Sequence, residues 1–357
     1  MTGVGVFLLR HRRWLAGLLA ALAGLVNRLT PLDLVQFSDL GRTVLAGRFD
    51  EAYAGTFTQA GPLQLVLSTV VLIGGHDGMP PALPRVLVDV ALTLGAMAAC
   101  GGKPIREGLV AVVTLLWLLG PVPWSGHPPE VLIPVLWAAA VASEERGRWW
   151  ASGAALGVSA LITPLAVLGY PCLLAATGPV RAARTMVAAT GIAVLGYLPF
   201  VLSGRFGMFG HVWPVVPGTV PYQLGLHEMT WWARLGQAVV VAGGCALVAY
   251  LLRGRPVAMA AAPLTAALLR VATDPQQVDY YWLPVSVGTV LLIALLPEDF
   301  PAWRQVSTAV MGYLTMLAAT TDHYMPGALL CSAGFLLAGV RLRSRSLSRP
   351  TAPVRSL

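Results

Sequence analysis

The feature that most constrains this chain is a series of apolar runs, each about 14 to 20 residues long, that recurs along its whole length. Charged residues make up 11% of the sequence and the mean hydropathy is +0.71, which excludes an ordinary soluble enzyme. Lipid offers no partner to backbone N–H and C=O groups, and the strand alternation of a barrel is missing. The sequence therefore predicts an all-α, polytopic transmembrane bundle of about 12 to 13 helices.

One membrane domain accounts for residues 1–340, because no segment is long and polar enough for a separate soluble domain. The basic tail 341–357, rich in Arg, Ser and Pro, is expected to be disordered and cytoplasmic. Arginines before the first apolar run could also belong to a signal peptide, but an uncleaved helix is favoured because more membrane sequence follows. No basic stripe of the kind that binds nucleic acid is evident.

The arginines set the expected orientation, because positively charged loops of membrane proteins stay in the cytoplasm. They gather at Arg10–Arg13, Arg146 and Arg148, Arg181 and Arg184, Arg253 and Arg255, and Arg341–Arg349. The external face then receives 31–61, 120–128, 203–232, 272–281 and 321–325. We expect a multi-pass protein of the bacterial cytoplasmic membrane, with its site on this external face.

Two apolar stretches are expected to depart from simple spans. Three stretches lie between the first external loop and Pro121. If all three crossed the bilayer, the segment 120–128 would lie on the cytoplasmic side instead of the external one. The stretch 62–75 is the shortest of the three and the weakest candidate to cross. Thr163 and Pro164 divide a longer run into two short pieces, which favours a hairpin with an external tip. Gly153 and Gly157 predict one close contact between helices.

The first external loop carries the most informative polar residues. Its apolar side chains Leu40, Val44, Leu45 and Phe49 could cover one face of a short interfacial helix within 31–61. Asp39, Arg42 and Arg48 would then lie on the water side. A plain solvated amphipathic loop explains these charges equally well when each is taken singly.

The order of elements around this loop resembles the class C (GT-C) glycosyltransferases, and most closely the mannosyltransferases of glycosyltransferase family 87. The resemblance rests on a single N-terminal helix, an external loop with Ser38-Asp39-Leu40, the segment 47–53 (Gly-Arg-Phe-Asp-Glu-Ala-Tyr), and Gly61-Pro62-Leu63 at the next helix. Gly126-His127-Pro-Pro-Glu130 and the run 153–164 are also similar. It covers about residues 1–200 and implies transfer of a sugar from a polyprenyl-phosphate donor.

Under this resemblance Asp39 matches the acidic first-loop residue that acts as general base on the acceptor hydroxyl. Asp33, Asp50 and Glu51 of the same loop are weaker candidates for this base. Such a base must lie within hydrogen-bond reach of that hydroxyl, on the face opposite the leaving phosphate. The leaving phosphate requires fixed positive charge, for which Arg42, Arg48 and Arg270 are the candidates. Arg270 is notable because it lies inside an apolar run near its external end.

Further polar and aromatic residues of the external loops are candidates for substrate binding. They are His127, Glu130, His211, His227, Asp279, Tyr280 and His323. His127 and Glu130 depart from the family pattern, which has a residue such as Gln there. Aromatic residues at a membrane boundary also form interfacial belts, and boundary histidines are often simple surface residues.

A bound metal is not predicted, although a divalent cation stays possible for this reaction class. The external side has few carboxylates and no Asp-x-Asp pair, which favours a metal-independent site. The cysteines Cys100, Cys172, Cys245 and Cys331 are isolated in apolar stretches and are interpreted as packing residues.

The sequence thus predicts an inverting glycosyltransferase that moves a hexose, by resemblance mannose, from a polyprenyl-phosphate donor. The acceptor would be a glycolipid, a cell-envelope polysaccharide or a protein. A membrane transporter or lipid flippase is the alternative, since such proteins also consist of many helices with polar residues near the bilayer midplane. A non-catalytic membrane scaffold is the third reading.

Overall fold

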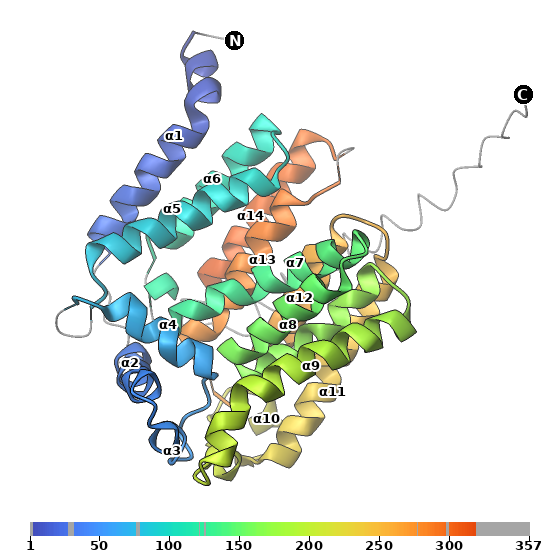
Figure 1. Cartoon of the computed structure of the whole chain (residues 1–357). Helices are drawn as coiled ribbons and strands as arrows, with labels where there is room; N and C mark the ends of the chain where they lie inside the picture. The colour runs from blue at the N-terminus through green and yellow to red at the C-terminus, as the bar shows by residue number, and fades with distance from the viewer. Residues whose placement is uncertain are drawn as a thin grey trace, which may run out of the picture.

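The computed structural model describes residues 3–27, 32–75, 79–120, 122–124, 126–276, 278–297 and 300–318 (Figure 1). These residues are mostly helical, and their only strands form a two-residue antiparallel pair, which confirms the predicted all-α class. His323, Cys331 and the tail 341–357 lie outside the described residues.

The α-helices in chain order are α1 (Gly3–Val26), α2 (Leu32–Leu45), α3 (Phe49–Ala52), α4 (Pro62–Leu72), α5 (Ala82–Ala99), α6 (Pro104–Leu118), α7 (Leu132–Glu145), α8 (Trp149–Ile162), α9 (Pro179–Leu202), α10 (Val220–Gln223), α11 (Trp231–Leu251), α12 (Ala258–Ala272), α13 (Leu283–Ala294) and α14 (Ala302–Ala318). The 3-10 helices are η1 (Val122–Trp124), η2 (Pro128–Val131), η3 (Pro164–Ala175), η4 (Met208–Gly210) and η5 (Asp279–Trp282), and the strands are β1 (Trp213–Pro214) and β2 (Glu228–Met229).

Three of the described helices, α5, α9 and α11, are long and apolar enough to cross a membrane. They contain 18, 24 and 21 residues, and a spanning helix needs about 20. Several other apolar helices, among them α4, α8 and α12, are shorter. The structure therefore supports membrane association, and the larger bundle of about 12 to 13 spans stays a prediction.

Helices α5 and α6 form an antiparallel pair that packs beside α1 (Figure 1). Gly24 of α1 allows this approach, because a Cβ there would lie 2.8 Å from the Val86 Cα. At the other end of the pair, Glu107 binds both Arg12 and Arg13 at 2.6 Å. The α5–α6 turn therefore lies at the same end as the N-terminal arginines.

The stretch 62–75 contributes only α4, which has 11 residues and packs against α2 of the first loop. At 1.5 Å per residue this helix is about 16 Å long, roughly half of the hydrocarbon thickness. Its length agrees with the expectation that this stretch does not span the bilayer.

The main core lies between α7, α8, η3, α9, α11, α12 and α13. Gly157 of α8 faces Ile192 of α9 so closely that a Cβ would lie 2.7 Å from the Ile192 Cβ, and Gly153 lies near Ala188 in the same contact. This is the close helix contact that the two glycines predict. The α8 helix ends before Thr163, where the backbone oxygen of Ile162 accepts a hydrogen bond from Gly61 of the first loop at 2.8 Å.

Candidate functional site

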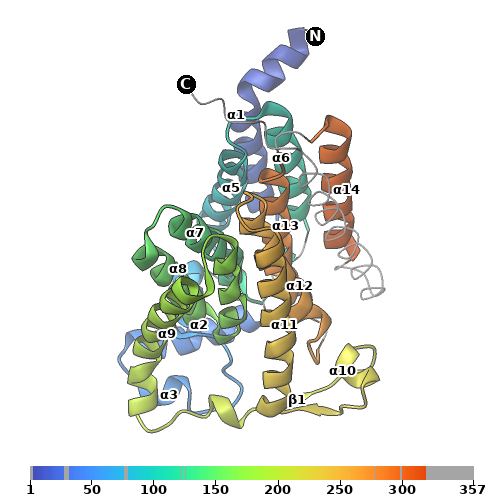
Figure 2. The same ribbon diagram turned by 90° about the vertical axis from the view of Figure 1, so that its right-hand side faces the viewer.

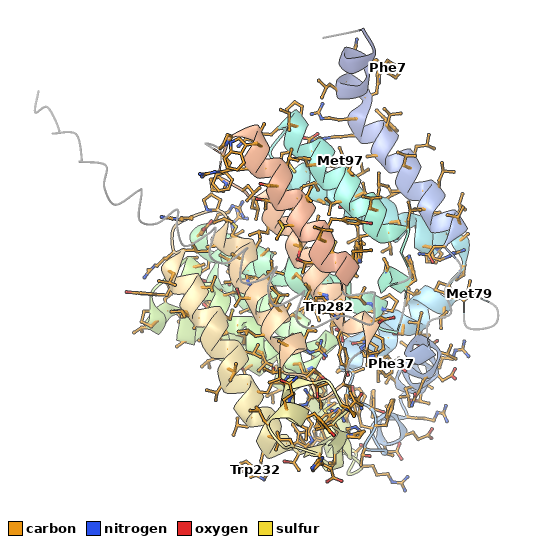
Figure 3. The ribbon with its side chains drawn as sticks, turned by 180° about the vertical axis from the view of Figure 1, so that it is seen from behind. Phe7, Phe37, Met79, Met97, Trp232 and Trp282 are labelled. Atoms are coloured by element: carbon orange, nitrogen blue, oxygen red, sulfur yellow. The ribbon has the colours of Figure 1, made fainter. Side chains whose placement is uncertain are left out.

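Four segments from distant parts of the sequence meet at one end of the bundle. They are the first turn of α2, the connection 126–131 with η2, the end of α12, and η5. Figure 3 shows the side chains of this region, with Phe37 of α2 and Trp282 of η5 labelled. The polar side chains within it form the candidate site.

His127 lies at the centre of this site. Its Nδ1 is 2.9 Å from Glu130 Oε1, and its Nε2 is 3.3 Å from Asp33 Oδ2. The Tyr280 hydroxyl donates a 2.6 Å hydrogen bond to the same Asp33 oxygen, and the Tyr280 ring stacks on the imidazole at 4.2 Å. Phe37 covers another side of the ring at 4.8 Å. The histidine is therefore held between two carboxylates and two aromatic rings.

Arg270 continues the line of alternating charges. Its guanidinium lies 3.6 Å from Glu130 Oε2 and 4.5 Å above the ring of Tyr281. The side chains of Arg270 and Glu130 are only 12% and 2% exposed, so both charges are largely withdrawn from water. Burying two charges is favourable only when they are paired, so this contact needs to be kept for the site to hold its shape.

The connection before η2 is shaped to place His127. Gly126 has a φ of +62°, and a Cβ at this position would lie 2.2 Å from Tyr280 Cδ1. A side chain at this position would therefore displace the tyrosine ring that stacks on His127. Just before Gly126 in the chain, Trp124 Nε1 donates a hydrogen bond of 3.2 Å to the buried Asp89 of α5. The segment is thus attached to α5 at one end and to α12 at the other.

Burial alone lowers the pKa of His127, but the contacts with Asp33 and Glu130 outweigh it and raise that pKa above its ordinary value. The pKa of Asp33 is lowered, first by His127 and further by the hydrogen bond from Tyr280. For Glu130, burial raises the pKa, yet the contact with His127 and the charge of Arg270 lower it overall. Both carboxylates thus favour the imidazolium form of His127 over the neutral ring.

These directions predict how stability depends on pH. Because the pKa of folded His127 is raised, its contribution is complete below the ordinary value of 6.5 and is lost as the pH rises through the folded-state pKa. Because the pKa values of Asp33 and Glu130 are lowered, their contributions are lost only as the pH falls through those values. We expect the unfolding temperature in detergent to fall above pH 6.5 and this decline to vanish in His127→Gln. A decline of the same size in both proteins would contradict the assignment.

Three first-loop charges predicted for the site lie outside this cluster. Asp39 and Arg42 form a 3.5 Å pair on the exposed face of α2, where their side chains are 65% and 66% exposed. Arg48 pairs with Glu51 at 2.9 Å and is also exposed. Two residues apart on a helix, Phe37 and Asp39 point to nearly opposite sides, so the side of α2 that meets His127 is not the side that carries Asp39.

The remaining described candidates for substrate binding lie outside the cluster. His211 contacts the Trp213 ring at 4.8 Å, and burial together with the charge of Arg234 lowers its pKa. His227 is exposed and lies 6.0 Å from the Tyr222 ring. Asp279 is exposed at the first position of η5. Of the seven, the structure brings His127, Glu130 and Tyr280 into one cluster, together with Asp33, a weaker candidate for the base.

A second buried ion pair was not predicted. Arg234 of α11 lies 3.0 Å from Asp274, which follows α12, and the two side chains are 5% and 1% exposed. Arg234 also donates to Gln237 at 2.7 Å, and Gln237 donates to the backbone oxygen of Arg270 at 3.3 Å. Two features of the sequence could have indicated this pair: Arg234 lies at the start of an apolar run, and Asp274 follows Arg270 by four residues.

Within the described part of the chain, no group of three His, Cys, Asp or Glu side chains could hold a metal ion. The geometry of the cluster gives the reason, because Asp33 and Glu130 contact opposite nitrogens of the same imidazole. Their oxygens therefore do not converge with a histidine nitrogen on one point. The three described cysteines, Cys100, Cys172 and Cys245, are buried and free.

No protein-family model, curated protein or solved structure matches this chain.

Proposed function

We propose that this protein is an inverting glycosyltransferase of the class C type, which moves a hexose, taken here as mannose, from a polyprenyl-phosphate donor. The acceptor is a glycolipid, an envelope polysaccharide or a protein at the external face of the membrane. The observation that carries the proposal is the buried cluster of Asp33, His127, Glu130 and Arg270 where the first loop meets the end of the helices.

The reaction needs a cation where the donor phosphate departs. As the acceptor oxygen bonds to the anomeric carbon, the bond from that carbon to the phosphate oxygen breaks, and the phosphate takes the electron pair. Arg270 suits this role because its 3.6 Å contact with Glu130 is long, and its Nε is buried without a hydrogen-bond partner. A phosphate oxygen would give the Arg270 Nε the acceptor that it lacks.

The reaction also needs a carboxylate that is free to take a proton. Asp39 is exposed and, among the residues that the structure describes, pairs with Arg42 alone, at 3.5 Å, so an acceptor hydroxyl can reach it. The Asp33 carboxylate already contacts His127 and accepts a hydrogen bond from Tyr280. These contacts lower the pKa of Asp33, which makes it a weaker base than an ordinary aspartate. We therefore propose Asp39 as the base and assign the anchoring of His127 to Asp33. Because Asp39 lies on the side of α2 away from the cluster, this role requires α2 to turn toward Arg270 when donor and acceptor bind.

One observation favours the alternative of a transporter. A histidine between two carboxylates, buried among helices, is an arrangement that also binds and releases protons in membrane transporters. The two functions differ in their products, because transport leaves the donor intact, whereas transfer breaks the bond between sugar and phosphate.

Proteoliposomes loaded with polyprenyl-phosphate-[³H]mannose and a lipid extract as acceptor distinguish these functions. We expect the protein to convert donor label into a product that resists the mild acid that hydrolyses the donor. Movement of intact donor across the bilayer, without a new labelled product, would instead support the transporter or flippase.

A further inference from the structure

The segment 212–226 has an unusual composition for a loop that joins two helices. It contains Val, Leu, Trp, Tyr, Pro, Gly, Thr and Gln but no charged residue, and His211 and His227 flank it. A loop surrounded by water is expected to carry more polar and charged side chains. We call this segment the external arm.

The external arm is folded and attached to the bundle at its base. Strands β1 and β2 pair with Trp213 opposite Met229, and Val215 donates to the oxygen of His227 at 3.0 Å. Val216 donates to the oxygen of Pro275 at 2.9 Å, which ties the arm to the segment after α12. Figure 2 shows β1 and α10 extending sideways from the lower end of α11, away from the other helices.

Apolar side chains become exposed toward the tip of the arm. Trp213, Val215 and Met229 at the base are buried against one another. Beyond them, Leu224 is 75% exposed, Tyr222 40% and Leu226 38%. An exposed apolar patch without charges marks a surface that contacts another molecule or a membrane.

The position of the arm identifies its partner. Helix α11 begins at Trp231, just after strand β2 at the base of the arm, and its 21 residues make it a candidate membrane span. At 1.5 Å per residue this helix is about 31 Å long, close to the roughly 30 Å of hydrocarbon in a bilayer. Trp232 in its first turn is 83% exposed, and tryptophan favours the membrane–water interface. The arm therefore leaves the bundle at the level of the lipid headgroups and runs sideways along them.

We infer that the external arm lies on the bilayer surface and inserts Leu224, Tyr222 and Leu226 into the interfacial layer of the external leaflet. An interfacial segment buries its apolar side chains at the boundary between headgroups and acyl chains, which matches the uncharged tip. The base of the arm reaches the buried ion pairs, because Arg234 stacks on Trp213 at 4.3 Å and binds Asp274. This inference does not depend on the proposed glycosyl transfer.

The test places an environment-sensitive bimane label on Leu224→Cys in the full chain, reconstituted in phosphatidylcholine nanodiscs. The matched control is Arg146→Cys, an exposed position of the charged turn between α7 and α8. The described native cysteines are buried, and the labelled unsubstituted protein supplies the background to subtract. Quenching is measured with phosphatidylcholine brominated near the headgroup and with iodide in the water. Tyr222→Cys provides a second probe if Leu224→Cys does not fold.

We expect bromolipid to quench the arm label at least about twofold more than the Arg146→Cys label, and iodide to quench it correspondingly less. Equal quenching of both labels by iodide would overturn the inference. Shielding from iodide without quenching by bromolipid would also overturn it, because the arm would then be covered by protein instead of lipid.

Discussion

Replacing Glu130 with alanine is expected to lower the free energy of unfolding by about 3 to 5 kcal/mol, the usual effect of removing one partner of a buried ion pair. The change would leave Arg270, which is 12% exposed, without its carboxylate and would remove the 2.9 Å contact that Glu130 makes with His127. Denaturation of the purified protein in mixed micelles, followed by circular dichroism, measures the change.

The chain offers a matched control for this prediction. Glu51 also forms a 2.9 Å pair with an arginine, Arg48, but its side chain is 46% exposed. An exposed pair contributes about 0 to 1 kcal/mol, so Glu51→Ala should leave the unfolding curve nearly unchanged. Glu130→Gln keeps the size and an acceptor oxygen and should fall between the two. Equal losses in Glu130→Ala and Glu51→Ala would show that the cluster does not hold the fold together.

The second large effect is expected in Asp39→Asn, which should reduce glycosyl transfer by about 10² or more, as the loss of a general base usually does. The asparagine keeps the size of the side chain but cannot accept the proton of an acceptor hydroxyl. Because Asp39 is exposed and its ion pair with Arg42 is long, at 3.5 Å, the free energy of unfolding should not change. Initial transfer rates and unfolding curves are measured on the same preparations.

Two other first-loop aspartates control for the loss of charge. Asp50 lies 3.8 Å from Arg205 on an exposed surface, so Asp50→Asn should retain the full rate. Asp33→Asn should lower stability, because it weakens the contacts with His127 and Tyr280. The assignment of the base to Asp39 would be wrong if Asp39→Asn kept full activity while Asp33→Asn lost more of its transfer rate than of its folded protein. Asp33 would then be the base.

The helical class of this protein could be predicted from sequence because apolar runs without strand alternation leave the backbone no other structure in lipid. The weakness of the stretch 62–75 was also visible, since α4 has only 11 residues. The number of membrane-spanning helices is harder to predict. Helices such as α12 and α13 have only 15 and 12 residues, and they are stabilised by packing against other helices instead of by a length that matches the bilayer.

The cluster was predicted only in pieces. His127, Glu130, Arg270 and Tyr280 were each recognised as polar residues of external segments, but nothing local to them shows that they touch. The hydrogen bond between Tyr280 and Asp33 joins residues 247 positions apart, and such contacts follow from the tertiary fold alone. The pair of Arg234 and Asp274 was not predicted, because the two residues are 40 positions apart and only the packing of α11 against α12 brings them together.

Transfer of radiolabelled mannose from polyprenyl-phosphate-mannose tests the central claim most directly. Membranes that contain the wild-type protein, the Asp39→Asn protein or neither are incubated with the donor, and label is counted in lipids and polymers after the donor is hydrolysed by mild acid. The proposed function predicts label that requires the wild-type protein and is lost in Asp39→Asn. Equal label in all three membranes, with this donor and with other polyprenyl-linked hexoses, would contradict the claim that the protein is a glycosyltransferase.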